Sequence, residues 1–315
     1  MPLSLRRGSV TAIVERQEGL VRCEVDGEPC VAYPRLTGPV ALGDDVLVNV
    51  QARELGLDSG GFDLLHANLT RGLGLRPAPG AHVLKLPYSP LQYAARHAEE
   101  DGEPRPLDGR AVVCLTLHSQ LAPICAALSG LRVAYVQLPG GALPVSLSDV
   151  VRAFELQTVA VGACFDGDRE AVNAASGLLC CDTDVIVCGI GPGVVATGSP
   201  WGHGAVAAAD AANAASALGA RPILCARVSD AAASEAHLGV SHHTRAALAL
   251  CLGDVIVAWP AGRQAPEWLV PRQDVDTSGW RDACAGLPLS HQDRGLDADP
   301  AFFEAAYAAG VLARG

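Results

Sequence analysis

The sequence predicts an α/β protein built from a small N-terminal β-barrel-like domain and an open, mostly parallel, Rossmann-like α/β sheet. Short alternating or β-branched runs, separated by turn residues, fill residues 1–70 and predict the β domain. Apolar runs alternate with alanine-rich helical patterns over residues 111–315, which is typical of a parallel sheet covered on both faces. Residues 71–110, rich in Gly and Pro, are predicted to bridge the two parts.

Five short runs predict strands in the first part, and turn pairs such as Asp26-Gly27 and Gly43-Asp44 divide them. The predicted strands span 9–14, 20–25, 29–33, 46–50 and 62–66. Their close spacing, with no helical period between them, indicates a small barrel or half-barrel. This part contains six Arg against ten Asp and Glu, a charge of −4, which argues against oligonucleotide binding.

Strands and helices alternate in the second part. The predicted strands span 111–117, 133–138, 158–162, 184–188, 222–227 and 254–259. The predicted helices span 120–129, 147–154, 169–179, 203–218, 242–251 and 300–313. Ligands of such sheets bind beyond the carboxyl ends of the strands, so we expect the functional residues in the segments that follow the strands.

Composition and charge exclude several classes of protein. Half of the 315 residues are hydrophobic, enough for a sizeable core, yet no apolar run approaches the roughly 18 residues of a membrane span. Residues 1–16 lack the apolar stretch of a secretory signal. The formal net charge of −11 argues against nucleic acid or a membrane as a partner. Eleven cysteines without a Cys-x-x-Cys pair predict reduced thiols and a cytoplasmic location.

The segment 189–204, after the fourth predicted strand, is the first ligand-binding candidate. It holds six glycines between a strand and a helix, which lets a ligand approach the backbone and the positive end of the helix. This predicts anion binding, although both G-x-G-x-x-G and the P-loop pattern fail. The alternative is a glycine-rich crossover that serves packing alone. The ligand-binding candidates here are Gly191, Gly193, Thr197, Gly198 and Ser199.

Ser241, His242 and His243 form the second candidate. Ser241 is predicted to cap the helix that follows, and we include it among the ligand-binding residues. Imidazoles in the first turn meet the positive end of the helix dipole, which favours the neutral form that a general base or a metal ligand needs. Adjacent histidines point about 100° apart on a helix, so we do not expect both to reach one metal ion. We expect acid–base roles for His242 and His243; the alternative is a solvated helix end.

Four further residues are single candidates. His118 and Ser119 follow the first predicted strand, and we assign His118 to acid–base chemistry and Ser119 to ligand binding. Neighbours in sequence seldom face each other, and no G-x-S-x-G elbow supports a hydrolase triad. Asp168 follows the third strand and is a further ligand-binding candidate. Lys85, the single lysine of the chain, is predicted to complement the anion from the bridge; the alternative is an exposed lysine retained by chance.

The motifs of the chain resemble those of a bacterial family of unknown function over almost the full length. The resemblance rests on residues 82–92, 117–120, 142–148, 167–173, 191–198, 239–244 and 294–303. It implies a shared fold and a shared site, without an assigned activity. The chain departs from the family pattern at Ala163, where a histidine is expected, and near Pro139, where an acidic residue is expected.

These observations favour a cytoplasmic enzyme, a hydrolase or transferase, that acts on a small anionic or carbonyl-bearing substrate. Backbone N–H groups of residues 191–199 are expected to hold the anion, and Lys85, the loop and the paired imidazoles are expected to converge at one rim of the sheet. The alternative is a non-catalytic ligand-binding, scaffold or regulatory protein. The sequence identifies no cofactor. Alanine-rich helices and the apolar pair Phe302-Phe303 suit a homodimer or, equally, a packed monomer.

Overall fold

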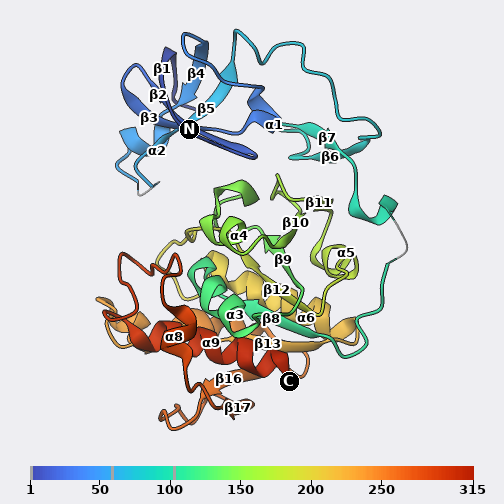
Figure 1. Cartoon of the computed structure of the whole chain (residues 1–315), viewed down its shortest axis with the longest axis vertical. Coiled ribbons are helices and arrows are strands. Elements are labelled where there is room, and N and C mark those ends of the chain that lie inside the picture. The colour runs from blue at the N-terminus through green and yellow to red at the C-terminus, as the bar shows by residue number, and fades with distance from the viewer. Residues whose placement is uncertain (1–2, 58–59, 102–103) are drawn as a thin grey trace. The chain divides into compact units, whose positions relative to one another are not determined.

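The computed structural model describes residues 3–57, 60–101 and 104–315 of the chain (Figure 1). The chain divides into two compact units, Met1–Ala95 and Arg96–Gly315. The boundary between them falls inside the predicted bridge at 71–110 and divides that segment. Across the described residues, none of the helices combines the length and the apolar character needed to cross a lipid bilayer.

The described part of the N-terminal unit contains a closed barrel of five strands in the order β1-β2-β3-β5-β4, which confirms the predicted barrel. The strands are β1 (Leu5–Gln17), β2 (Leu20–Val25), β3 (Glu28–Ala32), β4 (Asp45–Asn49) and β5 (Asp63–Asn68). Neighbours pair antiparallel except β3 and β5, which are parallel. Val46 and Val48 alternate with less buried residues along β4, so one face of the strand fills the barrel. The unit also holds α1 (Pro34–Thr37), α2 (Gln51–Glu54) and the hairpin of β6 (Val83–Lys85) and β7 (Tyr93–Ala95).

The described part of the C-terminal unit is built on an eight-stranded sheet in the order β11-β10-β9-β12-β8-β13-β16-β17, with every neighbouring pair parallel. Its strands are β8 (Ala111–Leu115), β9 (Val133–Leu138), β10 (Gln157–Val161), β11 (Arg169–Ala171), β12 (Val185–Ile190), β13 (Arg221–Cys225), β16 (Ile256–Pro260) and β17 (Arg272–Val275). Every residue of β8 and β12 is buried, as expected for central strands covered on both faces. The predicted parallel α/β sheet is confirmed.

Helices cover both faces of this sheet (Figure 1). They are α3 (Leu121–Ala127), α4 (Asp149–Ala153), α5 (Ala174–Leu179), α6 (Ala207–Ala217), α7 (His242–Leu250), α8 (Trp280–Cys284) and α9 (Pro300–Arg314). Apolar residues of α5, α6 and α7 join one core cluster, whereas those of α3 and α4 and most of those of α9 join the other. The neighbouring strands β8 and β12 therefore lead into helices, α3 and α6, on opposite faces of the sheet. Such a point is where open α/β sheets form a ligand crevice.

Two short strands and five 3₁₀ helices, labelled η, complete the described part of the unit. They are β14 (Val228–Ser229), β15 (Gly239–Val240), η1 (Ala98–Asp101), η2 (His118–Gln120), η3 (Val145–Leu147), η4 (Gly204–Val206) and η5 (Glu235–His237). The helix predicted over 169–179 is replaced at its start by β11, and α5 begins only after Asn173, whose side chain accepts a hydrogen bond from the Ser176 N–H. All eleven cysteines lie in the described residues and are free thiols.

Candidate functional site

A cavity of about 670 Å³ opens beyond the carboxyl ends of β8 and β12. Three segments line most of it: residues 117–119 after β8, residues 192–194 after β12, and residues 287–292 before α9. Arg227, two residues beyond the end of β13, and the start of α4 complete the lining. The cavity therefore lies where the topology of the sheet predicts a ligand site.

Arg227 is the most unusual side chain of this cavity. Its side chain is buried, with 2% of the residue exposed. Its Nη1 donates to Nδ1 of His243 at 3.1 Å, but Nε and Nη2 meet no acceptor among the described residues. Burial, and then the charge of Arg294, lower the pKa of Arg227 to about 10, so the guanidinium remains charged at neutral pH. A buried cation with two unused donors is suited to binding an anion.

The charges around Arg227 leave room for one negative group. Asp299 is fully buried, and its Oδ2 accepts hydrogen bonds from Ser229 Oγ at 2.6 Å and from Arg294 Nε at 3.3 Å. Asp299 is therefore paired with Arg294. The formal charges of Arg227, Arg294 and Asp299 sum to +1. Asp149 also lines the cavity, but its carboxylate is exposed and paired with Arg152.

Ser119 faces a histidine that is distant in sequence. Its Oγ lies 3.4 Å from Nδ1 of His291, which is buried and stacks on Phe302 with ring centroids 3.8 Å apart. Burial, followed by the charges of Arg227 and Arg294, lowers the pKa of His291 to about 3, so its imidazole is neutral and can accept a proton. A hydroxyl beside a neutral imidazole is the arrangement of an activated nucleophile, with a separation slightly above the usual range.

His118 points away from Ser119. The Tyr135 hydroxyl donates to the Ile190 carbonyl at 2.7 Å, so it accepts from Nδ1 of His118 at 3.1 Å, and Nε2 accepts from Ser148 Oγ at 2.7 Å. Burial lowers the pKa of His118 to about 4. Both ring nitrogens thus join β8, β9 and α4 to one another, and neither is left for the acid–base role that we expected.

The glycine-rich loop reaches the cavity at one of its five candidates. Of these described residues, Gly193 alone lines the cavity. A Cβ on Gly191 would lie 2.2 Å from the Ala142 carbonyl oxygen, so packing requires this glycine. Thr197 Oγ1 donates to the Gly202 carbonyl at 3.0 Å, and Ser199 Oγ accepts from the Gly202 N–H at 2.8 Å. These hydroxyls close the loop on itself, and Gly198 supplies a turn with φ of +77°.

Asp168 and Lys85 lie elsewhere. Asp168 Oδ2 accepts hydrogen bonds from the N–H and the hydroxyl of Thr158 at 2.8 and 2.9 Å. It therefore links the amino ends of β10 and β11, whereas the cavity lies beyond the carboxyl ends of the strands. Lys85 is on β6 of the N-terminal unit, whereas the cavity is part of the C-terminal unit, so its role at the site stays a prediction.

Four imidazoles lie close together next to Arg227, which donates a hydrogen bond to one of them. They belong to His203, His237, His242 and His243, and we call them the histidine cluster. Ser241 caps α7 as predicted, since its Oγ accepts from the His243 N–H at 3.2 Å. The expectation that the two adjacent side chains point apart is wrong: their ring centroids lie 4.5 Å apart, and both rings lie against that of His203.

The surroundings favour the neutral form of three imidazoles of the cluster. Burial, and then the neighbouring His203 and Arg227, lower the pKa of His243 to about 2. Burial, followed by the charge of Arg227, lowers the pKa of His237 to about 4, and burial also lowers that of His203. Neutral imidazoles keep lone pairs that can accept a proton or bind a metal ion.

The sequence reasoning missed Arg227, His291, His203 and His237. Arg227 carried a usable signal, because it is a charged residue placed directly after an apolar strand. His291 carried none, since 172 residues separate it from Ser119. His203 lies in the glycine-rich segment 189–204, and His237 lies between the strand predicted over 222–227 and the helix predicted over 242–251, so neither belongs to a local pattern that indicates a site.

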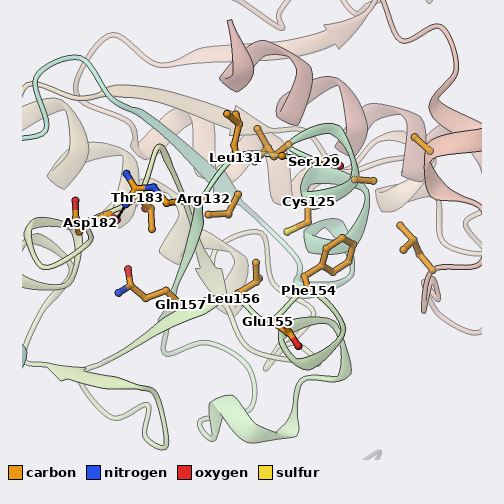
Figure 2. A pocket seen from close by; sticks show the side chains of 16 residues that line it. Cys125, Ser129, Leu131, Arg132, Phe154, Glu155, Leu156, Gln157, Asp182 and Thr183 are labelled. Atoms are coloured by element: carbon orange, nitrogen blue, oxygen red, sulfur yellow. Dashed lines mark hydrogen bonds between the residues drawn. The ribbon is translucent and has the colours of Figure 1, made fainter.

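A second hollow, of about 660 Å³, lies at the amino ends of the strands. Figure 2 shows Arg132 and Asp182 on one side of it and Cys125 and Phe154 on the other. Arg132 donates to the backbone carbonyl of Asp182 at 2.8 Å, and burial raises the pKa of the Cys125 thiol to about 12. Gln157 Oε1 is buried here without a partner among the described residues, but it is a neutral acceptor. The cavity at the carboxyl ends, which holds the unpartnered donors of a charged guanidinium, is therefore the better candidate.

Comparison with known proteins points to a family. The model of a family described as "Protein of unknown function (DUF3866)" matches residues 29–310, from the barrel to the last helix. No curated protein and no solved structure matches the chain. The match includes Arg227, the histidine cluster and the lining of the cavity, so these residues lie within the region that the family model describes.

Proposed function

The chain belongs to the family described as Protein of unknown function (DUF3866), and we propose that it is an enzyme, a hydrolase or transferase, acting on a small anionic substrate. The substrate class is a phosphate or carboxylate ester small enough for the cavity of about 670 Å³. The proposed compartment is the reducing cytoplasm, which the eleven free thiols favour.

The unpartnered donors of Arg227 carry this proposal. Leaving a buried donor without a partner costs about 1–3 kcal/mol, and more when the group is charged. Nε and Nη2 of Arg227 are two such donors within the described chain, and they lie side by side on one planar group. A carboxylate or phosphate accepts from both at once, which satisfies the donors and balances the charge of +1.

Ser119 and His291 supply the chemistry in this proposal. Ser119 Oγ attacks the carbonyl or phosphoryl centre of a substrate whose anionic group is held by Arg227. The hydroxyl proton passes to Nδ1 of His291, and the imidazolium returns it to the leaving group as the old ester bond breaks. Water then repeats the sequence on the Ser119 ester and releases the product.

The low pKa of His291 fits a base that becomes active only with substrate bound. Burial is the main cause of this low pKa, and the charges of Arg227 and Arg294 lower it further. A bound anion opposes both charges and therefore raises the basicity of the imidazole toward its ordinary pKa of about 6.5. Proton transfer from Ser119 is thereby tied to the presence of the anion.

The test combines calorimetry with inorganic phosphate and a panel of 4-nitrophenyl phosphate and carboxylate esters, using the full-length protein. We expect Arg227→Met to lose phosphate binding, and Ser119→Ala and His291→Gln to lose hydrolysis while they still bind phosphate. Ser290→Ala, in the same cavity lining, is the control and should behave as the wild type.

Two other outcomes would contradict parts of this proposal. Binding of phosphate without turnover of any ester would favour the alternative, a non-catalytic ligand-binding or regulatory protein. Absence of phosphate binding in the wild type would contradict the role of Arg227.

A further inference from the structure

The histidine cluster brings side chains from three separate segments to one place. His203 precedes η4, His237 ends η5, and His242 and His243 begin α7. The ring centroids of His203 and His243 lie 4.0 Å apart, and those of His203 and His242 lie 5.3 Å apart. One ring nitrogen from each of His203, His242 and His243 lies within 4.8 Å of the other two.

His203 offers a buried nitrogen that is unused. The residue is 5% exposed, and its Nε2 lies 3.0 Å from the Pro200 carbonyl oxygen. A carbonyl can only accept, so Nε2 carries the hydrogen of the neutral ring and Nδ1 carries the lone pair. Nδ1 is buried and has no partner within the described part of the chain. This atom is therefore ready to bind an electron-pair acceptor.

His242 is oriented in the same way from the other side. Its Nδ1 lies 3.2 Å from the Ala236 carbonyl oxygen, which places the hydrogen of the neutral ring on Nδ1 and the lone pair on Nε2. Histidines that bind metals usually donate their second ring nitrogen to a carbonyl or carboxylate in this manner. Two backbone carbonyls thus prepare His203 and His242 as ligands.

We propose that His203, His242 and His243 bind one divalent transition-metal ion such as Zn²⁺ or Co²⁺. Nitrogens around a tetrahedral zinc ion, with bonds of 2.0–2.1 Å, are about 3.4 Å apart. The three nitrogens, now within 4.8 Å, reach this spacing by small rotations of the side chains. Imidazole ligands suit this class of ion rather than Mg²⁺ or Ca²⁺. Three protein ligands leave the fourth position open, as in catalytic rather than structural sites.

Metal binding by His243 is linked to Arg227. Nδ1 of His243 now accepts from Arg227 Nη1 at 3.1 Å. If Nδ1 binds the metal, its lone pair is taken; if Nε2 of the neutral ring binds it, the ring hydrogen must move to Nδ1. Either way the bond to Arg227 breaks, and Nη1 becomes a third donor for the anion. This link rests on the proposed function, whereas metal binding itself does not.

The experiment titrates full-length, untagged protein, freed of metal by a chelator, with Co²⁺ and follows the visible d–d absorption. We expect one Co²⁺ per chain in a site of low coordination number, displaced by Zn²⁺. His242→Ala, a change at a partly exposed position, should weaken binding about 100-fold, since even an outer-shell change costs 10–100-fold. His203→Gln should do the same, and His66→Ala, on β5 of the barrel, is the control and should bind as the wild type.

The result also separates this inference from the proposed function. His242→Ala should still bind inorganic phosphate through Arg227, because it removes no group from the cavity lining. A wild-type protein that binds no Co²⁺, or variants of His203 and His242 that bind it as tightly as the wild type, would overturn the metal site. Circular dichroism and the melting temperature confirm that each variant is folded.

Discussion

Replacing Arg227 with methionine should weaken anion binding and, at the same time, stabilise the free protein. Methionine is also long and unbranched, so it fills most of the space that the arginine stem occupies. The substitution removes a buried charge together with the two unpartnered donors, Nε and Nη2. It also removes the donor that Nδ1 of His243 accepts from at 3.1 Å. Removing the buried charge and the unpartnered donors favours folding, whereas removing the hydrogen-bond partner of His243 opposes it.

The magnitudes follow from these groups. Relieving two unsatisfied buried donors gains about 2–6 kcal/mol, and leaving Nδ1 of His243 without its partner costs about 1–3 kcal/mol. The midpoints of these two ranges give a rise of about 2 kcal/mol in the free energy of unfolding, which raises the melting temperature by several degrees in a unit of this size. Loss of two charge-assisted hydrogen bonds, at about 1.5–3 kcal/mol each, should weaken phosphate binding by about 10²–10⁴-fold.

Urea unfolding and calorimetry with phosphate, run on the same preparations, measure both quantities. Arg245→Met is the matched control, because it removes the same charge from an exposed side chain that lies over Trp268. Opposite signs for stability and affinity in Arg227→Met are the expected signature. A variant that is destabilised yet binds phosphate as well as the wild type would refute the reasoning.

Three further predictions concern acid stability, packing and coupling. Burial lowers the pKa of His118 to about 4, so the unfolded chain takes up a proton near pH 6.5 that the folded chain accepts only near pH 4. About 3 kcal/mol of stability should therefore be lost as the pH falls between these values, and His118→Gln should flatten this slope in urea titrations; an equal slope would contradict it. Gly191→Ala should destabilise the protein by about 1–3 kcal/mol, since its Cβ would lie 2.2 Å from the Ala142 carbonyl oxygen. Gly295→Ala, whose Cβ meets nothing within 4 Å, should leave the urea midpoint nearly unchanged, and equal effects would refute the packing argument. Because metal coordination releases Nη1 of Arg227, phosphate should tighten Co²⁺ binding about 10-fold, and this coupling should disappear in Arg227→Met; coupling that survives in the variant would argue against the link.

The architecture could be predicted from the sequence because buried and exposed positions produce local patterns of apolar and polar residues. Central strands such as β8 and β12 are apolar at every position, and turn residues separate the short strands of the barrel. The strand β17 (Arg272–Val275) was missed because it carries charge and lies exposed at the edge of the sheet. Helix starts were recoverable where a cap is present, as at Ser241, and were placed too early where a strand intervenes, as at β11.

The candidate site was only partly accessible, because side-chain directions and distant pairings leave little trace in a local pattern. The rule that ligands bind beyond the carboxyl ends of strands selected Ser119 and Gly193, and both line the cavity. The same rule cannot tell that Ser119 meets His291, which comes from a loop near the end of the chain. The angle of 100° between adjacent helical residues describes where side chains begin, so it failed for the rings of His242 and His243.

A crystal structure of the protein soaked in tungstate, an anomalous scatterer that resembles phosphate, tests the central claim most directly. The proposal predicts an anomalous peak in the cavity beyond β8 and β12, with oxygens within hydrogen-bond distance of Nε and Nη2 of Arg227 and beside Ser119 Oγ. A map in which tungstate occupies other sites while the guanidinium of Arg227 is turned onto Asp299 would contradict it.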